Sequence, residues 1–279
     1  MIATRCSRRV LLCFLLTLGV TPGLVIGQEN AARPVAVLGI PAEVTDIEAR
    51  LSRATVERVQ GVPFVVGFVG ATRVVLGRTG AGKVNAAMVT TLLVSHYAPS
   101  AVFFTGTAGA LDPELRPGDV IVATGIGHHD FGASLEQQFV RRPTRNPVTG
   151  DVNPMFLPAD ERLLAAVRRA VPTVTLVPVP GTKRAPVIRE GLIVTGDAFV
   201  ANPAQRDELH RSLKAVAVEM EGAAVAQVSA QFAVPAIVIR SITDSADGST
   251  PDAYAANRDT ASRNAATLTL ASIASLGQR

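Results

Sequence analysis

The chain has almost no cysteine: of its 279 residues, only Cys6 and Cys13 are cysteines. Both lie in the first 27 residues, which we expect to be removed as a signal peptide. The remaining chain then has no thiol nucleophile, no cysteine-type zinc site and no disulfide. Among the four histidines only His128 and His129 are adjacent, and none has metal-ligand spacing. We therefore expect neither a metal ion nor a cofactor.

The amino-terminal apolar run is too short to cross a bilayer as a helix. It covers residues 10–20, follows Arg5, Arg8 and Arg9, and precedes a small-residue ending at Gly27. This three-part pattern is typical of a secretory signal peptide, whereas a membrane-spanning helix needs about 20 apolar residues. We predict cleavage after residue 27, an exported protein that is periplasmic or secreted, and no stable membrane anchor. An uncleaved amino-terminal anchor is the alternative.

A basic surface for nucleic acid is missing as well. The formal net charge of the chain is +4, and it falls to +1 when the three arginines of the signal peptide are removed. The sequence has no stripe of basic residues with interleaved aromatic residues. We therefore expect a small-molecule partner and no nucleic acid.

From Pro34 onward, short apolar runs alternate with longer amphipathic or alanine-rich stretches. This alternation is typical of an α/β fold, and the length favours a single domain over residues 28–279. The predicted strands are residues 35–39, 63–69, 72–78, 101–105, 118–123, 191–195, 214–218 and 235–242. The predicted helices are residues 42–53, 83–96, 159–170, 204–211, 221–231 and 252–275.

A loop-rich insertion interrupts this alternation at about residues 132–190. Residues 132–158 and 172–189 are rich in proline, arginine and glycine, and they flank the predicted helix at 159–170. Long loops in a compact domain either act as lids over a site or are passive insertions. The composition leaves both interpretations open.

Acidic residues stand at the ends of the last two predicted strands. Glu221 closely follows one strand and Asp244 follows the other. Ligands bind at the carboxyl-terminal edge of an open α/β sheet, and Met220 before Glu221 and Thr243 before Asp244 favour a sugar clamp beside a proton donor. Glu219 shares a face with Glu221 in an extended chain, so one of these two acids is expected to be structural.

Two glycine-rich segments also follow predicted strands. Residues 77–84 nearly match the phosphate-binding motif GxxxxGK[ST], but Val84 replaces the hydroxyl residue that would bind Mg²⁺. We therefore predict a backbone that approaches a small ligand at a helix start, and not a nucleoside triphosphate site. Residues 105–110 are all small, so their amides and a hydroxyl can face a ligand, with a tight turn as the alternative.

Glu43 and Phe199 follow two further predicted strands. Glu43 is a candidate site residue because of its place at the sheet edge, although an acid in the first turn of a helix is commonly solvated. Phe199 is either a core residue or a platform on which a base stacks.

Five segments of the sequence resemble the purine nucleoside phosphorylase superfamily, and within it the methylthioadenosine/S-adenosylhomocysteine nucleosidases. These segments are residues 79–84, 105–109, 191–199, 218–224 and 240–244. Each is short, but they occur in the family's order and span almost all of the chain after the signal peptide. The resemblance implies a nucleoside phosphorylase-like domain, with a central mixed, twisted β-sheet flanked by helices.

The resemblance further implies an N-ribosyl hydrolase with two catalytic carboxyl groups. Asp244 is implied to be the general acid that protonates N7 of the departing purine, and Glu43 the general base that activates the attacking water. The acid must stay protonated in a desolvated site while the base stays ionised. The segment from Gly39 to Glu43 is one residue shorter than the family's loop, which puts the position of Glu43 in question.

A substrate-binding site is also implied by the resemblance. Glu221 is implied to bind the ribose hydroxyls, Met220 to pack on the sugar, Phe199 to stack on the base, and the backbone of Val200 to bind the purine edge. The complete predicted set is Glu221, Met220, Phe199, Val200, Thr107, Gly109, Glu219 and Thr243. The family resemblance further implies a homodimer.

Two other functions remain as alternatives. Related phosphorylases have an arginine three residues before the hydroxyl residue that corresponds to Thr107, and here Phe104 occupies that position. An apolar ring cannot pair with a phosphate dianion, so we expect hydrolysis, with 5′-methylthioadenosine or S-adenosylhomocysteine as the expected substrate, over phosphorolysis. A non-catalytic exported nucleoside-binding or storage protein would be expected to lack one of the acids Glu43, Glu221 and Asp244, all of which are present.

Overall fold

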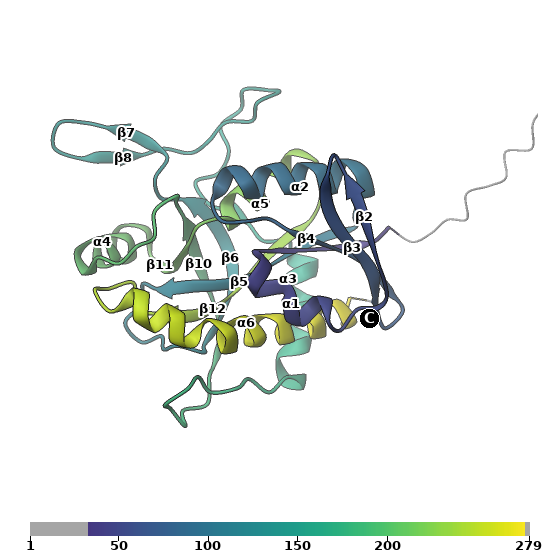
Figure 1. Cartoon of the computed structure of the whole chain (residues 1–279). Helices are drawn as coiled ribbons and strands as arrows, with labels where there is room; N and C mark the ends of the chain where they lie inside the picture. Colours follow the sequence, from purple (N-terminus) through teal and green to yellow (C-terminus); the bar gives the residue numbers. More distant parts are fainter. Residues whose placement is uncertain (1–32, 277–279) are drawn as a thin grey trace, which may run out of the picture. The chain divides into compact units, whose positions relative to one another are not determined.

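The computed structural model describes residues 33–276, whose arrangement is shown in Figure 1. The predicted signal peptide at residues 1–27 lies outside the described residues. The strands are β1 (Val35–Gly39), β2 (Ser52–Val59), β3 (Val62–Val69), β4 (Thr72–Arg78), β5 (Ala101–Ala110), β6 (Val120–His128), β7 (Gly132–Ser134), β8 (Phe139–Arg141), β9 (Leu157–Pro158), β10 (Ile188–Thr195), β11 (Ala215–Glu219) and β12 (Ala236–Asp244). The helices are α1 (Pro41–Glu48), α2 (Lys83–Tyr97), α3 (Glu161–Ala170), α4 (Pro203–Leu213), α5 (Gly222–Gln231) and α6 (Thr250–Ala274), with a short 3₁₀-helix η1 (Val171–Thr173).

One large mixed sheet forms the centre of the fold, which confirms the predicted α/β class. Its strand order is β11-β10-β6-β12-β5-β1-β4-β3-β2. The pairs β12/β5, β5/β1 and β1/β4 are parallel, whereas β6 pairs antiparallel with β12. The end of β5 also pairs antiparallel with β11, so the part of the sheet from β11 to β5 closes on itself.

Helices cover both faces of this sheet, as Figure 1 shows. α2 and α5 lie on one face, over a core that includes Leu93 and Val225. α1, α3 and α6 lie on the other face, over a core that includes Ile47, Leu163 and Leu268. Because both faces are buried, the central strands are nearly continuous apolar runs. Within the described part of the chain, no helix is both long enough and apolar enough to span a membrane.

The segment after β1 differs from the prediction. The predicted helix at residues 42–53 is too long, because α1 ends at Glu48 and the unpredicted strand β2 follows. β2 is an edge strand with mostly exposed side chains, so it lacks the apolar alternation by which a half-buried strand is identified. Gln60 and Gly61 have positive φ values of 52° and 82° and form the tight turn to β3.

The loop-rich insertion contains more regular structure than its composition indicates. β7 and β8 form a separate two-stranded sheet, and the short β9 pairs with β6. β6 itself continues to His128 instead of ending at residue 123, and β10 begins at Ile188 instead of residue 191. These short strands are stabilised by pairing with distant segments, and local residue pattern does not report such pairing. The helix predicted at residues 159–170 is confirmed as α3.

Candidate active site

A pocket of about 360 Å³ lies where β5, β11 and β12 meet. Gly109 at the end of β5 pairs with Val218 of β11 and with Asp244 of β12, so one backbone position joins both acidic strand ends. All of the predicted site residues line this pocket: Glu43, Thr107, Gly109, Phe199, Val200, Glu219, Met220, Glu221, Thr243 and Asp244. The other lining residues, which were not predicted, are Ile40, Ala81, Ala108, Ala198, Val218, Pro251 and Tyr254.

Glu43 lies in the first turn of α1, which begins at Pro41 directly after β1. Its buried carboxylate accepts hydrogen bonds from the backbone N–H and the hydroxyl of Thr107, at 2.8 and 2.6 Å. Thr107 was expected to face a ligand, and its polar groups bind Glu43 instead. Burial raises the pKa of Glu43, while Arg240, 3.4 Å from its second oxygen, and the Thr107 hydrogen bonds oppose this rise. The shorter loop therefore leaves Glu43 in the pocket.

Asp244 ends β12 and is nearly inaccessible to solvent. The Thr243 hydroxyl lies 2.7 Å from one carboxyl oxygen, and the Ala246 N–H donates a hydrogen bond to the other at 2.9 Å. Burial raises the pKa of Asp244, and these hydrogen bonds only partly oppose the rise. A carboxyl group in such a position retains its proton to higher pH than an exposed aspartate.

Glu219 ends β11, and its carboxylate is surrounded by protein donors. It accepts hydrogen bonds from the Thr195 hydroxyl, from the Glu221 N–H at 3.1 Å and from the Gly222 N–H at 2.8 Å, and it forms an ion pair with Arg240. α5 begins at Gly222, so the carboxylate also lies at the positive end of a helix dipole. Of Glu219 and Glu221, one was expected to be structural, and Glu219 has the contacts of that structural acid. It was also predicted as a substrate-binding residue, but its carboxylate binds protein groups.

Glu221 has fewer protein partners than Glu219. One of its oxygens accepts a hydrogen bond from the Gly82 N–H at 2.8 Å, and the other lies 3.4 Å from Arg240. Burial and the neighbouring Glu219 raise the pKa of Glu221 to about 7. A carboxyl group that titrates near neutral pH can exchange hydrogen bonds with sugar hydroxyls in either protonation state.

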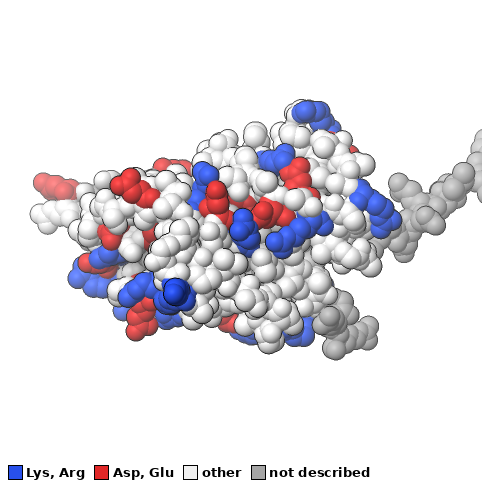
Figure 2. All heavy atoms as spheres, turned by 60° about the horizontal axis from the view of Figure 1, so that its bottom comes forward, with Lys and Arg blue, Asp and Glu red and all other residues white. Residues whose placement is uncertain are grey.

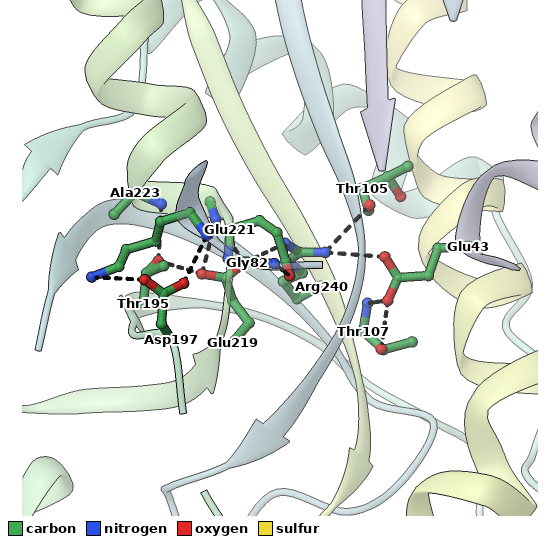
Figure 3. Close-up of polar contacts among 12 residues, drawn as sticks. Glu43, Gly82, Thr105, Thr107, Thr195, Asp197, Glu219, Glu221, Ala223 and Arg240 are labelled. Atoms are coloured by element: carbon green, nitrogen blue, oxygen red, sulfur yellow. Dashed lines mark hydrogen bonds and ion pairs between the residues drawn. The ribbon is translucent and has the colours of Figure 1, made fainter. Parts of the chain in front are cut away.

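Arg240 joins three of these carboxyl groups (Figure 3). Its fully buried guanidinium lies 3.4 Å from Glu43 and from Glu221 and forms a closer ion pair with Glu219. A Cβ atom at Gly106 would collide with both Arg240 and Glu43, so this approach requires glycine. No role was predicted for Arg240. The sequence did contain a signal for it: Arg240 lies inside the apolar run of β12, and a charge buried in such a strand must be paired with an opposite charge.

Aromatic side chains form another wall of the pocket. Phe199 is 50% exposed, so its interpretation as a core residue is wrong. Its ring meets the ring of Tyr254 edge to face, with 5.8 Å between the centroids. Tyr254 lies near the start of α6 and was not predicted, because the alanine-rich pattern of this helix does not show which residue faces a pocket.

The glycine-rich loop before α2 contacts acidic side chains of the protein. The Gly82 N–H donates to Glu221, and the Lys83 N–H donates to Asp197 at 2.8 Å. The Lys83 ammonium lies 2.6 Å from Asp130 and 3.5 Å from Asp197, and the Asp197 N–H donates to Asp130 at 2.8 Å. We call Lys83, Asp130 and Asp197 the loop latch. These contacts occupy amides that a bound phosphate would need.

Sequence comparison identifies related proteins over most of the chain. A family model described as the phosphorylase superfamily matches residues 34–274. A 5′-methylthioadenosine/S-adenosylhomocysteine nucleosidase of Mycobacterium bovis is 36% identical over 213 residues, which is 75% of this chain and 84% of the relative. An enzyme of the same name from Shewanella putrefaciens is 34% identical over 219 residues, which is 78% of this chain and 88% of the relative.

Solved structures show the same similarity. The 5′-methylthioadenosine/S-adenosylhomocysteine nucleosidase of Neisseria meningitidis, in complex with methylthio-immucillin-A, matches with a TM-score of 0.73 and 30% identity, over 87% of this chain and 99% of that chain. The futalosine hydrolase of Helicobacter pylori matches with a TM-score of 0.74 and 26% identity, over 87% of this chain and 97% of that chain.

Proposed function

The chain belongs to the phosphorylase superfamily, and we propose that it is a nucleosidase that hydrolyses the bond between purine and ribose in 5′-methylthioadenosine and S-adenosylhomocysteine. The relatives named for these two nucleosides support the substrate assignment. The observation that carries the proposal is a single pocket that holds Glu43, Glu221 and Asp244 together. These are the three carboxyl groups that the reaction requires.

Asp244 serves as the general acid. A purine anion is a poor leaving group, so a proton must reach N7 as the glycosidic bond breaks. The buried position of Asp244 raises its pKa and favours the protonated form that can give this proton. The Thr243 hydroxyl, 2.7 Å from Asp244, fixes the orientation of the carboxyl group.

Glu43 serves as the general base for the attacking water. Burial raises its pKa, which makes it a stronger base, while Arg240 and Thr107 limit the rise and keep the ionised form accessible. The water attacks the anomeric carbon as the positive charge on the ribose ring reaches its maximum, and Glu43 accepts the proton. Two carboxyl groups in different surroundings thus perform the acid and base steps in one site.

Glu221 binds the ribose hydroxyls. Its Gly82 and Arg240 contacts hold the side chain in place from two directions. The oxocarbenium-like transition state carries positive charge on the sugar, and an ionised carboxylate next to the ring stabilises that charge. Phe199 supplies the exposed aromatic face on which the purine stacks.

Water is the proposed nucleophile because the pocket offers little to bind phosphate. Within residues 33–276, no lysine or arginine lines it. Arg240 contacts three carboxylates of the pocket lining, and its guanidinium lies 4.1 Å over the buried ring of Phe104. A phosphate dianion would have to displace these carboxylates from a fully buried guanidinium.

The proposal is tested by following base release from a panel of nucleosides, with and without phosphate. The panel contains 5′-methylthioadenosine, S-adenosylhomocysteine, futalosine, adenosine, inosine and uridine. We expect phosphate-independent release of adenine from the first two. Strict dependence on phosphate would establish a phosphorylase, release from futalosine alone would reassign the substrate, and no release from any nucleoside would favour a binding or storage protein.

We also propose that the protein is exported, on the basis of the signal-peptide pattern in residues 1–27. Salvage of external nucleosides is the corresponding role. Cell fractionation and amino-terminal sequencing of the native protein test this proposal. A cytoplasmic protein with an intact amino terminus would contradict it.

A homodimer is proposed from the family resemblance. The packed helices α2 and α5 offer a candidate face, because Val84 and Met88 of α2 and Phe232, directly after α5, are large apolar residues with exposed side chains. Light scattering on the purified protein is expected to give the mass of two chains, and Met88→Glu is expected to shift the protein toward monomer. A wild-type monomer at micromolar concentration would refute this proposal.

A further inference from the structure

Glu43 borders a second cavity besides the active-site pocket. This cavity is a groove of about 330 Å³ between α1 and α6, and Glu43 lines both the groove and the pocket. We call it the α1/α6 groove. Its other polar lining residues are Thr45 and Asp46 of α1 and Arg258, Asp259, Ser262 and Arg263 of α6. The catalytic scheme above uses none of these six residues.

Ser262 lines the groove with a hydroxyl group that lacks a protein partner. The residue is 4% exposed, and among residues 33–276 its Oγ finds no hydrogen-bond partner. Ser272 of the same helix shows the ordinary arrangement, because its hydroxyl donates to the Leu268 carbonyl at 2.7 Å. Buried hydroxyl groups without a protein partner commonly bind an ordered water molecule, and at about 30 Å³ per water the groove has room for several. We therefore assign a water-binding role to Ser262.

Groups that can carry a proton lead from the buried end of the groove to the solvent. Glu43 and Asp46 are three residues apart on α1, and Asp259 and Ser262 are three residues apart on α6, so the members of each pair are neighbours on their helix. The side chain of Glu43 is 3% exposed, that of Asp46 is 37% exposed and that of Asp259 is 79% exposed. The carboxyl groups of the groove thus form a series of rising exposure.

The groove contains more carboxyl groups than cations. Arg258 pairs with Asp259 at 3.0 Å and Arg263 pairs with Asp46 at 3.3 Å, and Glu43 is the third carboxyl group. Arginine does not release its proton, so only the carboxyl groups, the hydroxyl groups and water can pass one on. Figure 2, which brings the α6 side of the molecule forward, shows acidic and basic side chains interspersed across this face. The groove therefore does not open into a basic field that would repel a proton.

Each turnover of the proposed reaction leaves a proton on Glu43. The attacking water forms a bond to the anomeric carbon and gives one proton to Glu43, while Asp244 gives its proton to N7 of the purine. The next turnover requires that one proton leaves Glu43 and that another reaches Asp244. At this moment the purine and ribose products occupy the pocket. A route on the other side of Glu43 allows the base to recover before the products depart.

We propose that the α1/α6 groove is the route by which the proton leaves Glu43 after each turnover, through a water molecule bound by Ser262. This inference rests on the proposed function. Glu43 gives its proton to this water, the water passes a proton to Asp46 or Asp259, and the aspartate releases it to the solvent. Glu43 returns to its ionised form, and every other group in the route ends as it began. Ser262 is a positioning residue in this scheme, because it acts through the water.

The test separates the first turnover from the later ones in Ser262→Ala. The first turnover begins with ionised Glu43, so its rate constant in a rapid-quench assay of adenine release is expected to stay within about twofold of the wild type. We expect kcat to fall about tenfold, which is less than the 10²–10⁴-fold contribution of a positioned acid or base, because the pocket remains as a slower exit. A burst of adenine followed by slow steady-state release is the expected signature. Imidazole, a small proton acceptor, is expected to restore kcat as its concentration rises.

Two further variants accompany this test. Ser272→Ala is the matched control, since it removes a buried serine hydroxyl from the same helix but outside the groove, and it is expected to show no burst. A variant that combines Asp46→Asn and Asp259→Asn is expected to show the same difference between first and later turnovers as Ser262→Ala. Ser262→Ala removes a hydroxyl without a protein partner, so it is expected to keep the wild-type Tm.

The outcomes separate this inference from the proposed function. An unchanged kcat in Ser262→Ala would overturn the route, and so would a first turnover that is slowed as much as kcat. A reduced kcat that imidazole does not restore would also overturn it. These three results leave the nucleosidase assignment in place. If the wild-type protein releases adenine from neither 5′-methylthioadenosine nor S-adenosylhomocysteine, the proposed function fails and the inference fails with it.

Discussion

Replacement of Arg240 by methionine is the most informative perturbation of this site. Methionine preserves much of the side-chain volume above the Phe104 ring but removes the positive charge. Glu43, Glu219 and Glu221 then lose their shared cation, and all three side chains are nearly inaccessible to water. The variant leaves three carboxyl groups in a buried site with only hydrogen bonds to stabilise their charges.

The expected loss of stability follows from the burial of this cluster. Removing one partner of a buried ion pair costs about 3–5 kcal/mol. For a domain of this size, each kcal/mol lowers Tm by about 2–4 °C, so Arg240→Met is expected to unfold about 6–20 °C below the wild type. The total stability of a domain is about 5–15 kcal/mol. The variant is therefore expected to fold at low temperature.

The same substitution is expected to change the pH dependence. Arg240 lowers the pKa of both Glu43 and Glu221, so its loss raises both pKa values further. The base must be ionised, and the acidic limb of kcat/KM is therefore expected to move to higher pH. A carboxyl group with a raised pKa in the folded state binds its proton more tightly there than in the unfolded chain. Because Glu221 of the wild type titrates near pH 7 and that of the variant titrates at higher pH, its contribution to the stability deficit is expected to grow as pH rises above about 7.

The assays are urea unfolding at several pH values and kcat/KM profiles for adenine release. Arg240→Lys is the control, because lysine keeps the positive charge but lacks the planar guanidinium group. Compared with Arg240→Met, it is expected to recover part of the stability and most of the wild-type pH profile. An Arg240→Met protein with wild-type Tm would refute the buried-cluster energetics. A stability deficit that is constant from pH 5 to pH 8 would refute the coupling between Arg240 and the carboxyl groups.

Three further predictions concern single residues of the site. Asp244→Asn is expected to reduce turnover of purine nucleosides by about 10²–10⁴-fold while calorimetry still detects nucleoside binding; near-normal turnover would remove Asp244 from the acid role. Because burial raises the pKa of Glu221 to about 7, wild-type stability is expected to fall as pH rises from about 4.5 to 7, and Glu221→Gln should flatten this decline in urea titrations. Lys83→Met removes the cation that joins Asp130 and Asp197 in the loop latch. KM is expected to rise several-fold with little change in kcat, and a change in kcat alone would contradict a role of the loop latch in substrate binding.

Much of the fold was accessible from the sequence because its central strands and helices have strong local patterns. The apolar runs that became β1, β3, β4 and β12 are buried on both faces, and such runs are identified without knowledge of their partners. β2 was missed because an exposed edge strand has no apolar alternation. β7, β8 and β9 were missed because they are short and held by pairing alone.

The sequence also predicted part of the candidate site, namely the residues that lie in short motifs at strand ends. Glu221 and Asp244 stand at strand ends in short, specific motifs, and both line the pocket. Arg240 lay within one of these motifs, yet its role depends on the three carboxylates that surround it in space. No local sequence pattern marks Tyr254, because its place in the pocket wall depends on which face of α6 meets the pocket.

By itself, the sequence determined the α/β class, the family and the acidic residues of the candidate site, because residue types and short motifs are local properties. Only the tertiary structure decided how these acids meet. β11 runs antiparallel to β5, so in an open sheet its carboxyl end would lie away from that of β12. The sheet closes on itself at Gly109, between Val218 and Asp244, and hydrogen bonding between segments distant in the sequence brings the two acidic strand ends into one pocket.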